Sequence, residues 1–163
     1  MTKEYFIELA DYNVWATDIF CGMLDKISDA EWTQKVASSF NTIQETTLHI
    51  ISAEKAWFER FEKKPVEWLQ FTYKGSKEEH IELWKKASTN LKDFIADFDE
   101  NNLQTILHYK RLNGEEKSTP FYIMFAHVFN HSTYHRGQLV TMLRKVGFND
   151  IKGTDFIGFY RND

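Results

Sequence analysis

Three histidines, His127, His131 and His135, lie four residues apart within an apolar run from Phe121 to Val146. On a helix, residues four apart lie nearly above one another, so the spacing predicts a stripe of imidazoles on one face. Two neighbouring rings can bind one metal ion, as in other motifs with histidines at i and i+4. The outer pair is two turns apart, roughly 12 Å at 1.5 Å per residue. A third ligand must therefore come from another segment.

His49 is the natural candidate for that ligand, because it lies on a different segment with helical apolar periodicity. We expect His80, which follows hydrophilic residues, to be solvated, and His108 falls in a predicted hairpin. Three neutral imidazoles leave a divalent ion its full charge and at least one open position, which is typical of a catalytic zinc site. Such an ion lowers the pKa of a bound water or thiol.

Each histidine could instead be a hydrogen-bonded or half-exposed residue with no ligand role. The i, i+4 pair favours a shared ligand role, since two buried imidazoles without one both carry a desolvation cost. His127 is expected to support the ligands from one turn away, with a substrate contact or a core position as alternatives. Glu45 lies one turn before His49 and could orient that ring, but we favour a capping role with Thr42.

The elements that must position these residues follow from capping signals and apolar periodicity. Capping boxes begin at Ser28, Thr42 and Ser76, and the first opens only a short turn around Trp32. Thr119 is predicted to cap a last helix with proline at its first position, and Gly147 to end it. The four predicted helices span Lys3 to Lys26, Ile43 to Lys63, the Ser76 box to at least Phe98, and Pro120 to Val146.

Between the third and fourth helices, Asn113-Gly114 favours a tight turn joining two short strands. The segment from Val66 to Gly75 is aromatic without periodicity and is predicted to be a packed loop. The tail from Gly153 to Arg161 is expected to lie across the helices. This order predicts an all-α four-helix bundle with a small β-hairpin, and the lack of repeats or linkers predicts one domain over residues 1–163.

Composition narrows the function classes. The 163 residues carry 20 basic and 24 acidic side chains, a net charge of -4, so nucleic-acid binding is disfavoured. One cysteine rules out an internal disulfide framework and is compatible with a reducing compartment. No apolar stretch approaches the roughly 18 residues of a membrane span, and the first residues do not resemble a secretory signal. We therefore expect a cytoplasmic protein without membrane or nucleic-acid partners.

Several segments together match a known family. They are Tyr12-Asn-Val-Trp-Ala16, the His49 region with Ala53-Glu-Lys-Ala-Trp57, His131-Ser-Thr-Tyr-His-Arg-Gly-Gln138 and Asp155-Phe-Ile-Gly-Phe-Tyr-Arg161. The chain resembles the DinB-like family of small metal-binding four-helix bundles, also called the YfiT-like fold, over essentially its whole length. The resemblance implies a metal triad, which maps onto His49, His131 and His135, and it implies a homodimer.

Characterised members of that family include S-transferases that use low-molecular-weight thiols such as bacillithiol, and a mycothiol-dependent maleylpyruvate isomerase. The resemblance therefore favours a thiol S-transferase that uses a divalent ion, zinc or nickel, and a small-molecule substrate. The alternatives are a metal-dependent hydrolase, a non-catalytic metal-binding stress-response dimer, and a scaffold with incidental histidines. Arg136 could hold an anionic substrate group or pair with an acidic residue at a helix crossing. No catalytic residue is assigned.

Overall fold

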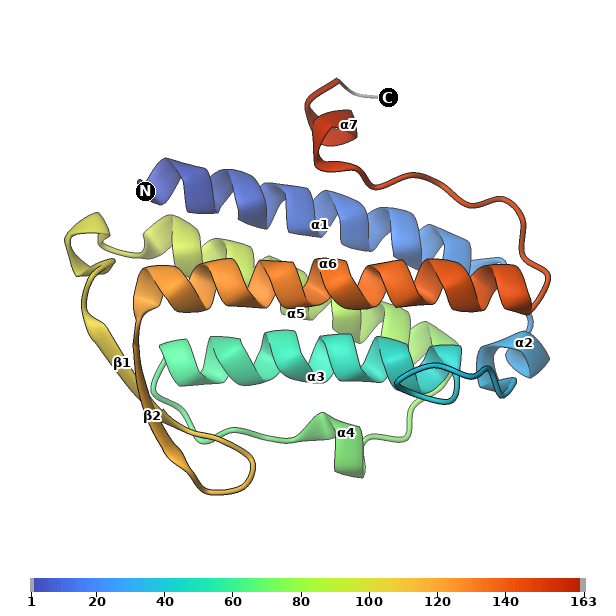
Figure 1. Ribbon diagram of the computed structural model, residues 1–163, viewed down its shortest axis with the longest axis horizontal. Coiled ribbons are helices and arrows are strands. Elements are labelled where there is room, and N and C mark those ends of the chain that lie inside the picture. Colours follow the sequence, from blue (N-terminus) through green and yellow to red (C-terminus); the bar gives the residue numbers. More distant parts are fainter. Residues whose placement is uncertain (1, 162–163) are drawn as a thin grey trace.

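The computed structural model describes residues 2–161, which form a bundle of four long helices with short elements around it (Figure 1). The long helices are α1 (Lys3–Asp25), α3 (Ile43–Phe61), α5 (Lys77–Asp97) and α6 (Phe121–Lys145). In Figure 1, α1 and α6 run in one direction and α3 and α5 in the other. Because α3 and α5 are parallel, the chain between them must return along the bundle. That return segment contains the short helix α4 (Leu69–Thr72).

Local capping chemistry begins several of the helices where the sequence predicts. The boxes at Ser28 and Ser76 are reciprocal and open α2 (Asp29–Thr33) and α5. The box at Thr42 is one-sided: its hydroxyl accepts from the Glu45 N–H at 3.0 Å, but the Glu45 carboxylate accepts from the Asn41 N–H at 2.8 Å. Glu45 therefore holds the chain entering α3 and does not orient His49.

The helix bounds differ from the prediction by one or two residues, and two of these differences have a local cause. The second long helix, α3, ends at Phe61 because Lys63 adopts a left-handed φ of 58° and the Lys64 N–H bonds back to the Glu59 carbonyl at 2.8 Å. The predicted cap at Thr119 is also wrong. Thr119 is in a strand, and Pro120, with an extended ψ of 146°, is itself the N-cap of α6.

The hairpin consists of antiparallel strands β1 (Ile106–Lys110) and β2 (Glu116–Pro120), with Gly114 at a φ of 83° in the turn. A single turn of 3-10 helix, η1 (Glu100–Asn102), leads into it. The predicted loop after Val66 contains α4, whose Leu69 is buried against the bundle. The four-helix bundle with a small hairpin is confirmed.

The C-terminal helix α7 (Phe156–Arg161) packs against α1 at the outer side of the bundle (Figure 1), whereas the sequence predicts a tail that lies across the helices. Ring centroids are 5.0 Å apart between Tyr12 and Phe156 and 5.7 Å apart between Trp15 and Phe159. The Tyr12 hydroxyl also donates to the Thr154 carbonyl at 2.7 Å. None of the helices within residues 2–161 has the length and the apolar character needed to cross a membrane.

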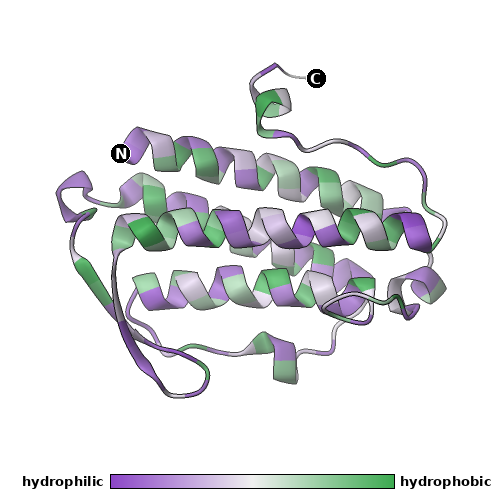
Figure 2. Ribbon diagram, in the orientation of Figure 1, coloured by the Kyte–Doolittle hydropathy of each residue, from purple (hydrophilic) through white to green (hydrophobic). Residues whose placement is uncertain are grey.

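The core consists of two apolar clusters, separated by a layer of buried polar side chains. One cluster includes Phe20, Ile50, Trp84 and Leu139, and the other includes Phe6, Phe61, Leu91 and Phe125. Along each long helix, the polar residues fall between the two clusters. Figure 2 shows this change along α6, whose middle turns are hydrophilic to neutral between more apolar segments. The members of the layer are Asn13 and Thr17 from α1, Glu54 from α3, Ser88 from α5, and Ser132 and Arg136 from α6.

Candidate metal centre

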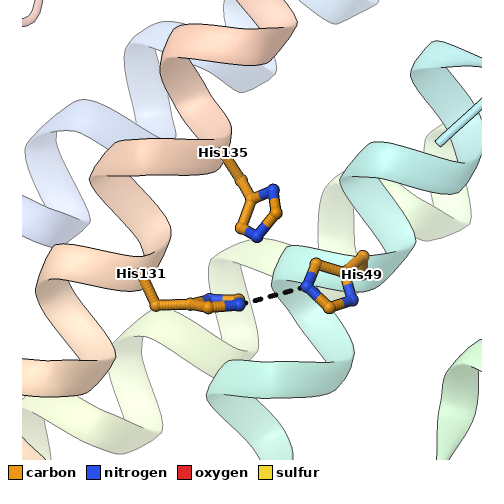
Figure 3. Close-up of side chains that lie close together, drawn as sticks. All are labelled: His49, His131 and His135. Carbon is orange, nitrogen blue, oxygen red and sulfur yellow. Dashed lines mark hydrogen bonds between the residues drawn. The ribbon is translucent and has the colours of Figure 1, made fainter. Parts of the chain in front are cut away.

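Three histidines converge between α3 and α6. His49 projects from α3, and His131 and His135 project from successive turns of α6 (Figure 3). The Nε2 atoms of His49 and His131 are 3.1 Å apart, and one ring nitrogen from each of the three histidines lies within 4.8 Å of the others. Two zinc–nitrogen bonds of about 2.0–2.1 Å at a tetrahedral angle place their nitrogens roughly 3.4 Å apart. The cluster therefore has the donor set and the dimensions that a divalent ion requires.

Burial keeps these imidazoles neutral. It lowers the pKa of His49 to about 4, with the neighbouring His135 adding to the shift and the Gln70 side chain opposing it. Burial and the other nearby histidines lower the pKa of His131 to about 3. The pKa of His135 is also lowered by burial, against the effect of its bond to Gln138. Near pH 7 all three rings can offer a nitrogen lone pair.

A hydrogen-bonded chain orients His135. Its Nδ1 lies 2.9 Å from the Gln138 Oε1, and the Gln138 Nε2 donates to the Ser39 hydroxyl at 3.0 Å. Because the amide oxygen can only accept, this bond places a proton on Nδ1 and leaves the Nε2 lone pair free. The role of Gln138 was not predicted from the sequence, although the i, i+3 spacing of His135 and Gln138 could have indicated it.

An aromatic side chain, Phe40, packs against His49 and His135. The Phe40 ring centroid is 4.4 Å from that of His49 and 5.9 Å from that of His135. The Nδ1 atoms of His49 and His131 are buried, and neither has a hydrogen-bond partner among the described residues. The Nε2 atoms of these two rings face each other at 3.1 Å, so each ring points its Nε2 toward the centre of the cluster.

Replacing Gln138 with leucine is expected to weaken zinc binding by about 10- to 100-fold, the usual effect of removing a group that orients a histidine ligand. The reason is that His135 loses the acceptor that selects its tautomer. A competition titration against a chromogenic chelator measures the change. The matched control is Gln44→Leu, a polar position on α3 away from the three rings, and equal affinities in the two variants would contradict the assignment.

The remaining histidines lie outside the cluster. The His127 ring packs against Trp57, with centroids 5.4 Å apart, and lies 6.0 Å from the His131 ring. It is adjacent to the triad, but no hydrogen bond links it to the three rings. His108 is exposed on the hairpin, where its Nδ1 lies 2.8 Å from the Ser118 hydroxyl.

The prediction that His80 is solvated is wrong. Its side chain is fully buried, because the first turn of α5 directs the ring between Trp32 and Tyr73. The Nδ1 atom lies 2.7 Å from the Ser76 carbonyl, and Nε2 has no partner among the described residues. Burial lowers the pKa of His80 below its usual range.

The buried His80 predicts a loss of stability in acid. Below pH 6.5 the unfolded chain binds a proton at this ring that the folded chain resists, so the free energy of unfolding falls as pH falls. The contribution approaches 1.4 kcal/mol per pH unit until the folded ring itself titrates. Chemical denaturation at pH 7.5 and pH 5 should show a smaller decrease for His80→Gln than for the wild type. An identical decrease in both proteins would contradict this role.

Arg136 does not face the three histidines. It is 2% exposed, donates to Asn13 Oδ1 at 2.6 Å and to Thr133 Oγ1 at 3.0 Å, and lies over the Tyr12 ring. These contacts are closer to the predicted pairing at a helix crossing than to the predicted contact with an anionic substrate. The direct partner of Arg136 is the amide of Asn13, however, and not a carboxylate. Cys21 is also buried, and burial raises the pKa of its thiol to about 12, which makes it a core residue rather than a nucleophile.

Comparison with known proteins agrees with this fold. The sequence model described as the DinB family matches residues 1–159. Protein DinB from Bacillus subtilis (strain 168) is 25% identical over 156 residues, which cover 90% of this chain and 88% of that protein. The fold and the histidine cluster define a helical bundle with a candidate metal centre between two of its helices. The chain belongs to the DinB family.

Solved structures show the same architecture. A DinB-like protein from Bacillus cereus ATCC 10987 superposes with a TM-score of 0.74 at 22% identity, covering 93% of this chain and 97% of that one. A DinB-like protein from Bacillus subtilis superposes with a TM-score of 0.68 at 14% identity, covering 90% and 96%. At these identities the likeness establishes the fold.

Proposed function

We propose that the chain binds a divalent metal ion, zinc or nickel, through His49, His131 and His135, and that it transfers a low-molecular-weight thiol such as bacillithiol to an electrophile. The supporting observation is the donor set. Among residues 2–161, the group that could hold an ion comprises three histidines and includes no cysteine, aspartate or glutamate. Three neutral ligands leave the ion its full charge and an open position, so that a bound thiol acquires a lower pKa and becomes a nucleophile near pH 7.

The residues around the triad have supporting roles in this proposal. Gln138 keeps His135 in the tautomer that offers Nε2, and Phe40 covers one side of the His49 ring. In the transfer, the sulfur forms a bond to the electrophilic carbon, the leaving group departs with the bonding electrons, and the thiol proton passes to solvent. We further propose that the protein is a homodimer in the cytoplasm, in line with the family resemblance. We propose a small molecule as its substrate, because the net charge of -4 disfavours nucleic acid as a partner.

The decisive experiment supplies the zinc- or nickel-loaded protein with bacillithiol and monochlorobimane and follows the fluorescent thioether. Turnover is expected in the wild type, with release of chloride and a proton. It should disappear in His49→Ala and persist in Gln44→Ala, which changes a different polar residue of the same helix. Equal rates in the wild type and His49→Ala would rule out the transferase.

Two other functions use the same residues. A hydrolase is favoured by the same open position, which suits water as well as a thiol, and it would turn over esters or amides with no thiol present. A non-catalytic role is favoured by the position of the ligands on two different helices, because an ion bound to them cross-links α3 to α6. In that case, removing the metal lowers the melting temperature while no substrate is consumed.

A further inference from the structure

A second feature lies at the hairpin end of the bundle, where β1 and β2 pass beside the end of α3 (Figure 1). A cleft of about 850 Å³ lies between the hairpin and the segment after α3, and it adjoins a smaller cavity of about 460 Å³. Arg60, Trp68 and Tyr109 line both spaces. These volumes are in the range of small-molecule sites.

The cleft is rich in positive charge, although the whole chain has a net charge of -4. One carboxylate, Glu116, also lines the larger space. Most of the cations are in exposed ion pairs, such as Lys110 with Glu116 at 3.2 Å and Arg111 with Glu115 at 3.2 Å. Exposed pairs of this kind contribute little and exchange readily with a ligand. The basic lining consists of Arg60, Lys63, Lys64, Lys110, Arg111 and Lys117.

Arg60 differs from the other cations in being half-buried and without an acidic partner. Its guanidinium lies over three rings, 4.5 Å from the centroid of Trp57, 5.1 Å from that of Trp68 and 5.3 Å from that of Tyr109. One nitrogen donates to the Lys110 carbonyl at 3.0 Å. Its Nε is buried without a hydrogen-bond partner, and no carboxylate of residues 2–161 lies within 4.0 Å of it.

Such an arrangement is suited to an anion. The aromatic rings hold the planar guanidinium in place, and its charge and several of its donors are left for a ligand. A carboxylate matches the fork of N–H groups in the same plane and can accept two of them. The rings beside it offer apolar faces to the remainder of the ligand.

The cleft also leads toward the histidine triad. His127 lines the smaller cavity together with Arg60 and Trp57. Its ring is 5.4 Å from Trp57 on one side and 6.0 Å from His131 on the other. His127 therefore lies between the smaller cavity and the triad, and none of the three triad histidines lines either space.

We propose that this cleft binds the carboxylate end of a small anionic molecule through Arg60, with Lys117 and Arg111 contributing charge. Where the proposed function holds, that molecule is the thiol or the substrate whose other end reaches the triad. The binding step itself does not depend on the metal. His127 then lies between the anion site and the metal centre and contacts the middle of the ligand.

Isothermal titration of the metal-free protein with succinate tests the binding step, with inorganic phosphate as a second probe. We expect saturable succinate binding, about 10- to 100-fold weaker in Arg60→Met, which keeps the aliphatic bulk and removes the charged donors. Arg144→Met, a loss of the same charge at the far end of α6, should bind like the wild type. His49→Ala should also bind like the wild type, which separates this site from the triad.

Three outcomes would overturn the proposal: no saturable binding by the wild type, equal affinity in Arg60→Met and Arg144→Met, or tighter binding of phosphate than of succinate. If Arg60→Met does not fold, as thermal melting will show, Lys117→Met on the exposed strand replaces it and should weaken succinate binding severalfold. In the thiol-transfer assay, Arg60→Met is expected to raise KM with little change in kcat. Saturable succinate binding by a wild type that shows no thiol transfer would contradict the proposed function and leave the anion site supported. Thiol transfer by a wild type that does not bind succinate would contradict the anion site alone.

Discussion

A His49→Ala variant is expected to lose stoichiometric zinc, with an affinity at least about 100-fold below that of the wild type. The reason is geometric. His131 and His135 lie on one helix, and His49 is the ligand that α3 contributes to the group. Removing a residue that only orients a ligand already costs about 10- to 100-fold, so removing the ligand itself costs more. Elemental analysis after dialysis and a competition titration measure the effect.

The control for this result is His108→Ala, which removes an exposed histidine on the hairpin and should leave the zinc content unchanged. Zinc should also raise the melting temperature of the wild type but not that of His49→Ala. At a free concentration 100 times Kd, the stabilisation is about 2.7 kcal/mol. A wild-type protein that retains no stoichiometric ion, or one that loses it equally in both variants, would show that the histidines are incidental.

Glu54→Ala is expected to lower the free energy of unfolding by about 3–5 kcal/mol, as breaking a buried network of charged and polar groups usually does. The Glu54 carboxyl group accepts from Ser132 and Ser88 at 2.8 Å and from Asn13 at 3.1 Å. Asn13 in turn accepts from the buried Arg136 at 2.6 Å. Alanine leaves these donors without an acceptor in a space that water does not reach.

Thermal and urea unfolding measure this effect, which corresponds to a decrease in melting temperature of roughly 6–20 °C for a domain of this size. The matched control is Glu82→Ala on α5, whose side chain is 76% exposed and which should change stability by less than about 0.5 kcal/mol. If Glu54→Ala melts within a degree or two of Glu82→Ala, the polar layer does not stabilise the fold.

The same layer ties together the helices that carry the candidate metal centre. Ser132 and Arg136 each follow a triad residue of α6 directly, and Glu54 lies five positions after His49 on α3. The bonds between them lock the two helices that carry the three histidines. Glu54→Ala is therefore expected to weaken metal binding as well as stability, and Glu82→Ala should do neither.

Residue types and their spacing are enough to predict the elements and the candidate triad. The serines at positions 28 and 76 and the glycine at position 147 act on backbone groups within a few residues, so their effect is readable from spacing alone. The i, i+4 spacing of His131 and His135 likewise fixes their common face once the helix forms. His49 could be predicted because it lies within the apolar-periodic part of its helix, whereas His80 lies in the first turn of α5 after hydrophilic residues.

Only the tertiary structure decided which side chains meet across the bundle. Glu54 and Asn13 occupy positions that the apolar periodicity assigns to the core, yet their partners are 34 to 123 residues away in sequence. The burial of His80 against Trp32 depends in the same way on packing between segments that are far apart in sequence. The same is true of the contact between Arg60 and Tyr109. Local spacing sets the face of a helix, whereas the identity of the neighbour on that face depends on how all four helices pack.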